Sequence, residues 1–248
     1  MPRYFIELSY KGTNYSGFQV QENANSIQAE VEKCLFIFYK VNIILTGSSR
    51  TDSGVHAKQN IFHFDFEEVK NFDNDRYNLN AILPADIVIQ KIFEVPANLH
   101  CRFDALSREY NYFIYCYKDP FLADKAYYFP YKIDKDKLDR AAELVSSTKD
   151  FTSFSKRNTQ VNNFKCSIYK SQWKVGSEGM NYEVTGNRFL RGMVRGLVGT
   201  MLKVGTGKMS IEEFRKIIDL KDCTKADFSV PAHGLFLMEV KYADGIMK

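Results

Sequence analysis

The chain has 248 residues, of which 45% are hydrophobic and 26% charged. This composition is ordinary for a globular protein with a sizeable core, and it excludes disordered and collagen-like chains. The 34 basic and 30 acidic residues give a net charge of +4, which is too small a surplus to identify a nucleic-acid-binding protein by itself. The five cysteines are widely spaced, without a CxxC pair or a zinc-like Cys/His spacing, so we predict reduced thiols and no structural metal site.

The beginning of the chain, MPRYFIELSYKG, enters an alternating apolar pattern at once. We therefore expect no signal peptide there. No apolar run reaches the length that a bilayer-spanning helix needs, so we expect no membrane segment and a cytoplasmic protein.

The first half of the chain has the pattern of an antiparallel sheet with helices on one side. Ser26 is a suitable N-cap for a helix over residues 27–39, in which apolar residues recur at helical spacing. The other elements that the pattern predicts are strands at 4–10, 43–45, 61–66 and 87–95 and a short helix ending at Leu83–Pro84. This order of strand, helix, strand, strand, helix, strand is that of a ferredoxin-like or RNA-recognition-like unit.

The second half follows that order more loosely. The elements that it predicts are strands at 110–117, 166–175, 180–186 and 235–242 and helices at 135–147, 189–204 and 210–220. We therefore predict an α+β protein made of two ferredoxin-like or RNA-recognition-like halves, residues 1–105 and 106–248. The halves are expected to share a mostly antiparallel sheet flanked by helices, with a central active-site cleft.

A polar stretch, SSRTDSGVHA at residues 48–57, directly follows the apolar run at 43–45. One interpretation is a turn, because Asp caps its own backbone and Gly54 supplies a positive φ. The other is a reactive loop in which Asp52 is the working carboxylate and Arg50 its companion. His56 is expected to form structural hydrogen bonds.

Three arginines occur in NRFLRGMVRGLVGTMLKVG, residues 187–205. Arg188, Arg191 and Arg195 follow at spacings of three and four, so we expect them to share one side of a helix. Glycines inside a helix cost about 1 kcal/mol each relative to alanine, so Gly192, Gly196 and Gly199 indicate that another segment approaches closely. Asp52 is a candidate partner for an arginine at this position, because guanidinium groups suit carboxylates.

In order along the chain, these segments resemble the tRNA pseudouridine synthase A family. The stretch at 48–57 resembles the family's catalytic loop, with Ser49 where the family usually has glycine. The other matching segments are YKGTNYSGFQVQ (10–21), SIQAEVE (26–32), LNAILPADI (79–87), HCRFDALSREYNYFIY (100–115), DFTSFS (150–155), residues 187–205 and VPAHGLFLMEVKY (230–242).

The resemblance implies an enzyme that converts uridine to pseudouridine at positions 38, 39 and 40 of the tRNA anticodon stem-loop. By this resemblance Asp52 is the catalytic aspartate, and Arg50 fills the space that the flipped base leaves. Tyr110 stacks on the target uracil, and Arg195 pairs with Asp52. The carboxylate has three possible roles, namely attack at C1′, addition to C6 or removal of the C2′ proton.

The family resemblance also implies a homodimer that binds tRNA without a metal or a cofactor. Lys156, Arg157, Lys165, Arg188 and Arg191 are candidates for contacts with the tRNA backbone. Two other classes of protein are alternatives. A non-catalytic RNA-binding protein would carry aromatic RNP-like patterns, which the sequence lacks. An Asp-dependent hydrolase would need a second carboxylate or a metal cluster beside Asp52.

Overall fold

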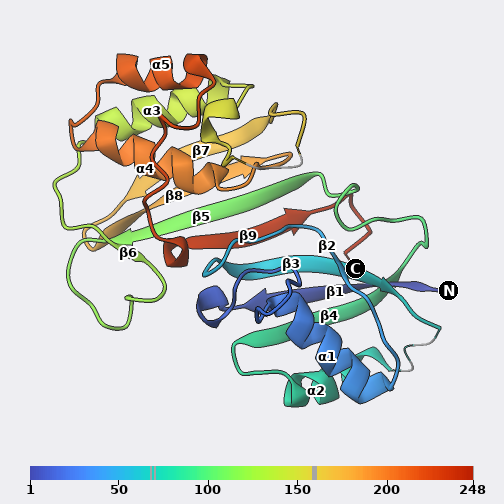
Figure 1. Cartoon of the computed structure of the whole chain (residues 1–248). Helices are drawn as coiled ribbons and strands as arrows, with labels where there is room; N and C mark the ends of the chain where they lie inside the picture. Colours follow the sequence, from blue (N-terminus) through green and yellow to red (C-terminus); the bar gives the residue numbers. More distant parts are fainter. Residues whose placement is uncertain (68, 70, 158–160, 248) are drawn as a thin grey trace. The chain divides into compact units, whose positions relative to one another are not determined.

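The computed structural model describes residues 1–67, 69, 71–157 and 161–247 and forms two compact units (Figure 1). Met1–Leu106 and Leu237–Lys248 make the first unit, and Ser107–Phe236 makes the second. The predicted division at residues 105 and 106 assigned the last strand to the second half. In the structure this strand groups with the first unit from Leu237 on. Val240 N donates to Gln59 Oε1 over 2.9 Å, and Tyr242 packs on Phe5.

The first unit is built on antiparallel strands. Its strands are β1 (Arg3–Tyr10), β2 (Thr46–Gly47), β3 (His56–Asp65) and β4 (Ile87–Val95). β9 (Leu235–Lys241) also belongs to it from Leu237 on. β1 lies between β4 and β3, and β2 pairs with β3. Helices α1 (Ile27–Tyr39) and α2 (Phe72–Ile82) lie on one side of these strands in Figure 1. The predicted order of elements is confirmed, with β2 lying just after the residues at which the second strand was expected.

Side chains rather than a neighbouring strand hold the segment just before β2. The prediction of a strand at residues 43–45 is wrong, although Leu45 is buried as expected. Glu32 Oε1 accepts Leu45 N at 2.9 Å, and Gln28 Nε2 donates to Leu45 O at 3.0 Å. Because two side chains of α1 satisfy these backbone groups, the segment needs no strand partner. The predicted cap of α1 is confirmed, since Ser26 Oγ accepts Ala29 N at 3.2 Å.

The second unit combines another antiparallel set of strands with three helices. Its strands are β5 (Ser107–Tyr115), β6 (Tyr127–Tyr128), β7 (Ile168–Val175) and β8 (Gly179–Gly186). β8 pairs antiparallel with both β5 and β7, and β6 adds a short parallel pair to β5. The helices are α3 (Lys135–Ser147), α4 (Met193–Gly205) and α5 (Ile211–Leu220), with α3 against β7 and α4 against β5. The α+β class, with mostly antiparallel strands flanked by helices, is confirmed.

Short 3-10 turns complete the fold at Gly12–Asn14, Thr152–Phe154 and Ala232–Gly234. Within the described residues, none of the helices is long and apolar enough to cross a membrane.

The two faces of the second unit's sheet differ in polarity. Tyr112, Tyr182 and Trp173 align across β5, β8 and β7 and are almost fully buried. Successive side chains of a strand point to opposite faces, so Glu183 lies on the other face, where it pairs in register with Asn111 and Gln172. Its carboxylate is only 8% exposed.

Four neighbouring side chains keep Glu183 charged. Burial by itself raises the pKa of this carboxyl group, but hydrogen bonds from Lys170, Lys174, Gln172 and Asn181 outweigh burial and lower the pKa to about 2. The ion pairs to Lys170 and Lys174 measure 2.8 and 2.6 Å. A carboxyl group whose pKa is lower in the folded state contributes stability above its unfolded pKa and loses that contribution as the pH falls.

We expect Glu183→Gln to lower the free energy of unfolding at pH 7 by about 1–3 kcal/mol, because two lysines lose a buried partner. The difference from wild type should shrink as the pH falls from about 5 to about 2, where Glu183 itself becomes protonated. Urea unfolding at several pH values measures both effects. Glu178→Gln, which changes an exposed glutamate next to the same strand, is the control. A destabilisation that is the same at every pH would contradict this account.

Candidate active site

In the loop that precedes β3, buried side chains alternate with side chains that face the solvent. Ser49 and Thr51 are buried, at 8% and 7% exposure, whereas Arg50 is exposed and Asp52 is partly buried. Alternation of this kind is the geometry of an extended backbone, in which neighbouring side chains point in opposite directions. Arg50 and Asp52 therefore lie on the outer side of the same short segment.

Backbone contacts with the segment after β1 hold this loop in place. Phe18 N donates to Thr51 O at 3.0 Å, and Ser53 Oγ donates to Tyr15 O at 3.1 Å. Gly17 has a φ of +104°, and a Cβ atom there would lie 3.0 Å from Thr51 O. The close approach of the two segments thus requires a residue without a side chain at position 17.

The predicted turn is also present. Val55 N donates to Asp52 O at 3.1 Å, and Gly54 has a φ of +78°. His56 has the structural part expected of it, because its buried Nδ1 accepts Gly12 N at 3.0 Å. The turn and the reactive loop are compatible, since the turn uses the backbone of Asp52 and leaves its carboxylate on the outer side.

Ser49 fits this loop without strain. Among the residues that the structure describes, the non-glycine residues with positive φ are Asn23, Lys40 and Lys221, so Ser49 has an ordinary backbone conformation for a residue with a side chain. The serine that stands in place of the family's usual glycine is therefore tolerated here.

Tyr110 belongs to the second unit. It lies in the middle of β5, opposite Val184 of β8, and is 8% exposed. Its ring meets the ring of Phe189 edge to face, with 5.1 Å between the ring centroids. Such aromatic pairs prefer this geometry, which fixes the orientation of the tyrosine ring.

Helix α4 begins later than the sequence predicts. Gly192, with a φ of +73°, is its N-cap, and Met193 is its first residue. A left-handed glycine ends the preceding turn, so Arg188 and Arg191 precede the helix and only Arg195 lies in its first turn. The prediction that the three arginines share one side of a helix is therefore wrong.

The segment 227–231 runs closely along α4 and holds Arg195. Arg195 Nε donates to Val230 O at 2.9 Å, and its Nη2 is 3.4 Å from Phe228 O. A Cβ atom at Gly196 would lie 2.7 Å from the Phe228 ring, and one at Gly199 would lie 2.3 Å from Asp227 O. The prediction that these two helix glycines mark a close approach is confirmed. The approaching segment supplies the backbone carbonyl groups that accept hydrogen bonds from the Arg195 guanidinium.

Tyr112 is a neighbour of Arg195 that the sequence analysis did not single out. Its hydroxyl donates to Pro231 O at 2.7 Å, next to the carbonyl that Arg195 uses. Burial raises the pKa of Tyr112, and the nearby charge of Arg195 opposes this only in part. The YNY spacing in β5 was the available signal, because it places Tyr110 and Tyr112 on the same face of the strand.

Each of the two units carries two of the four predicted site residues. The first unit carries Arg50 and Asp52 on one loop, and the second carries Tyr110 on β5 and Arg195 on α4, which packs against β5. The pairing of Asp52 with Arg195 stays a prediction.

Basic side chains gather around a shallow pocket of about 340 Å³ in the second unit. Lys156, Arg157 and Lys221 line it together with one acidic residue, Asp222, and Lys156 N donates to Arg191 O at 2.9 Å. Lys221 is paired with Asp150 at 2.9 Å. Cations that converge in this way can bind phosphate groups.

One cluster in the first unit contains residue types that bind metals. The potential ligand atoms of His63, His100 and Cys101 lie within 4.8 Å of one another. The sequence pattern does not reveal this cluster, because His63 is on β3, far along the chain from the other two. However, His63 Nδ1 accepts Cys101 N at 3.3 Å, and His100 Nδ1 accepts Arg102 N at 3.1 Å.

These hydrogen bonds favour a structural role for the two histidines. A neutral imidazole that accepts at Nδ1 carries its proton on Nε2 and has no lone pair left for a metal ion. Burial, together with the nearby charge of Arg3, lowers the pKa of His63 to about 4, so this ring is neutral at pH 7. The imidazoles bind the backbone of residues 101 and 102.

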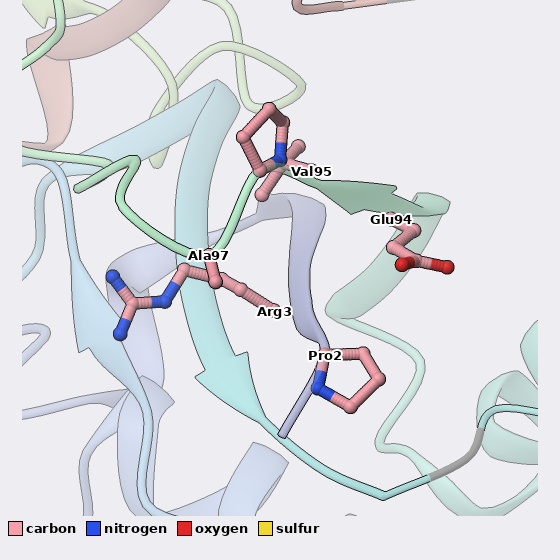
Figure 2. Close-up of a pocket in the computed structure, with 6 residues that line it drawn as sticks. Pro2, Arg3, Glu94, Val95 and Ala97 are labelled. Carbon is pink, nitrogen blue, oxygen red and sulfur yellow. The ribbon is translucent and has the colours of Figure 1, made fainter.

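A second shallow pocket, of about 360 Å³, lies where β1 begins and β4 ends (Figure 2). Pro2, Arg3, Glu94, Val95, Pro96 and Ala97 line it. The Arg3 guanidinium makes a two-point ion pair with Asp65, at 2.7 and 2.8 Å, and also donates to Leu99 O. The charge of Arg3 is thus used within the fold, and the pocket contains none of the four candidate residues.

Known proteins resemble the chain over its whole length. A family model described as tRNA pseudouridine synthase matches residues 141–243. Proteins named tRNA pseudouridine synthase A from Azobacteroides pseudotrichonymphae and Parabacteroides distasonis are each 41% identical to it. The alignments cover 100% of both chains for the first, and 98% of this chain and 97% of the relative for the second. A protein of the same name from Staphylococcus aureus is 36% identical, with 96% and 90% covered. The chain therefore belongs to the tRNA pseudouridine synthase A family and is an isomerase.

Proposed function

We propose that this isomerase converts uridine to pseudouridine at positions 38, 39 and 40 of the tRNA anticodon stem-loop, with Asp52 as the catalytic carboxylate. The observation that carries the proposal is the anchored loop, which holds the partly buried Asp52 and the exposed Arg50 on its outer side. Relatives named tRNA pseudouridine synthase A that match the whole chain support the choice of substrate and reaction.

The reaction breaks the bond between C1′ and N1 and forms a bond between C1′ and C5. The proton on C5 is lost to water, and N1 gains a proton, so no electrons enter or leave. A carboxylate suits this chemistry, because it can stabilise or add to an electron-poor carbon and can accept a proton. Asp52 supplies this carboxylate in our proposal.

The other three residues act on the substrate or on the carboxylate. The target base must leave its stack, at a cost of a few kcal/mol, and Arg50 fills the space that the base leaves. Tyr110 offers its flat ring to the detached uracil. Arg195 provides the counter-charge for Asp52 where water is excluded, and its anchorage on Val230 O and Phe228 O keeps that charge in place.

The basic surface of the second unit is a candidate contact for the tRNA backbone. Lys156, Arg157 and Arg191 lie close together there. Protein–phosphate contacts supply much of the affinity for nucleic acids and make it sensitive to salt.

The family resemblance further supports a homodimer that works in the cytoplasm without a metal or a cofactor. Sedimentation velocity at micromolar concentration tests the homodimer, and a monomer would contradict it. Cell fractionation tests the location.

Asp52→Asn should abolish the reaction while leaving the fold and tRNA binding intact, because the amide is isosteric with the carboxylate but cannot act as a nucleophile or base. Release of tritium from tRNA labelled at uracil C5 measures the reaction directly. We expect the rate to fall by at least about 1,000-fold. Asp244→Asn, at an exposed position, is the control and should match wild type.

The outcomes of this experiment separate the alternatives. Release by both wild type and Asp52→Asn would remove Asp52 from the chemistry and leave the synthase. Binding of tRNA without release by either protein would favour the non-catalytic RNA-binding alternative.

Arg50→Ala and Arg195→Ala should lower kcat more than they change the Kd for tRNA, because each residue acts after the tRNA has bound. We expect losses of about 10- to 1,000-fold. Arg191→Ala is the comparison, since a backbone contact should weaken binding and leave kcat nearly unchanged. Single-turnover rates and filter binding make the distinction. Equal losses of affinity in all three variants would show that Arg50 and Arg195 only bind phosphate.

The choice of uridines can be tested with three tRNA substrates. In each of them only one of the positions 38, 39 and 40 is a uridine, and the rest of the tRNA is unchanged. Mapping of pseudouridine by carbodiimide modification and primer extension should give product at all three positions and none at uridines elsewhere in the tRNA. Product outside the anticodon arm would contradict the proposed specificity and retain the synthase activity.

A further inference from the structure

The fully buried side chain of Asn60 in β3 lies directly behind the loop that carries Arg50 and Asp52. We propose that Asn60 is a positioning residue for this loop, and that its amide determines the positions of Arg50 and Asp52. The proposal rests on the function proposed above, and it adds a residue outside the loop to the machinery of the reaction.

Both N–H groups and the carbonyl oxygen of the Asn60 amide bond to the loop and its support. Its Nδ2 donates to Ser49 O at 3.0 Å and to the Tyr10 hydroxyl at 3.1 Å. Its Oδ1 accepts the Ser48 hydroxyl at 2.8 Å. The Asn60 side chain thus binds the backbone of Ser49 and the side chain of Ser48, the two residues that precede Arg50.

Tyr10 extends this hold to the other side of Arg50. Its hydroxyl is 2.8 Å from Thr51 Oγ1, and both residues are buried. Burial raises the pKa of Tyr10 to about 12, so the phenol keeps its proton at pH 7 and can donate it to Thr51. Thr51 lies between Arg50 and Asp52 in the sequence, so Asn60 and Tyr10 together determine the position of the residues around both functional side chains.

Burial makes this arrangement rigid. A buried polar group that loses its partner costs about 1–3 kcal/mol, so any displacement of the loop that breaks one of these bonds is penalised. Catalytic groups need such constraint, because a misplacement of about 1 Å can cost 100-fold in rate. Binding of tRNA depends on a wider set of contacts and should be less sensitive.

The test compares Asn60→Asp with wild type in the full-length protein. Aspartate keeps the shape and the acceptor for Ser48 but removes both N–H groups of the amide. We expect kcat for tritium release to fall about 10- to 100-fold, while the Kd for tRNA stays within about twofold, at a temperature where both proteins are folded.

Two further sets of variants separate positioning from a general loss of stability. Thr51→Val should lower kcat by about 3- to 10-fold, whereas Thr51→Ser, which retains a hydroxyl group, should stay within about twofold of wild type. Gln59→Ala is the matched control on the same strand, because it removes an amide that bonds Val240 N and Glu7 rather than the loop.

Amide hydrogen exchange supplies a readout that does not depend on activity. Exchange over residues 48–56 should be faster in Asn60→Asp than in wild type, and unchanged in Gln59→Ala. Faster exchange in the loop together with the loss of kcat supports the proposal. A normal kcat in Asn60→Asp, or slow exchange in its loop, would overturn it.

The same measurements keep the two proposals apart. If wild type releases no tritium, the proposed function fails, and the exchange experiment alone then decides whether Asn60 orders the loop. If wild type is active and Asn60→Asp is equally active, only the positioning proposal fails.

Discussion

The arrangement of the loop that carries Arg50 and Asp52 depends on the hydrogen bonds of the buried Asn60 amide. A loop that carries a charged pair on its outer side has little packing of its own, and its backbone polar groups must find partners inside the protein. Here Asn60 of β3 donates to the backbone carbonyl of Ser49, and the Tyr10 hydroxyl of the neighbouring strand β1 bonds the side chain of Thr51. The same side chains that satisfy buried hydrogen bonds also decide where Arg50 and Asp52 stand.

In the second unit, glycine residues rather than a buried amide allow a candidate side chain, Arg195, to be held in place. Gly196 and Gly199 leave room for the segment 227–231 on the surface of α4, and the carbonyl groups of that segment hold the Arg195 guanidinium. Helix glycines lower helix stability by about 1 kcal/mol each. Their presence is explained by close contacts with the Phe228 ring at Gly196 and with the Asp227 carbonyl group at Gly199, for which a methyl group would leave too little room.

In the function proposed above, these two arrangements serve the same reaction. An enzyme that breaks a glycosidic bond and rejoins the base at another carbon must hold a carboxylate, a counter-charge and a flat surface within narrow limits. Each of the four candidate side chains is attached to an element that packing or hydrogen bonds hold rigidly. Rigid placement of this kind is the support that catalytic groups need.

Local patterns in the sequence were sufficient for most of the fold. The helix over Ile27–Tyr39 with its Ser26 cap and the helix over Lys135–Ser147 lie where the sequence pattern placed them, because capping and helical periodicity act over a few neighbouring residues. The resemblance of the motifs to a known family named the four candidate residues. The connection between a polar loop and a reactive carboxylate was also available from the residue types alone.

Only the tertiary structure decided the features that depend on contacts between distant segments. The run at 43–45 reads as a strand, yet side chains of α1 bind its backbone. The start of α4 at Met193 follows from the left-handed Gly192, whose φ the sequence pattern does not contain. His63 meets His100 and Cys101, and Asn60 meets Ser48 and Ser49, because β3 runs beside those segments. The sequence by itself determined which residues could do the chemistry, and the tertiary structure decided what holds them, since hydrogen bonds between segments far apart in the chain leave no local pattern.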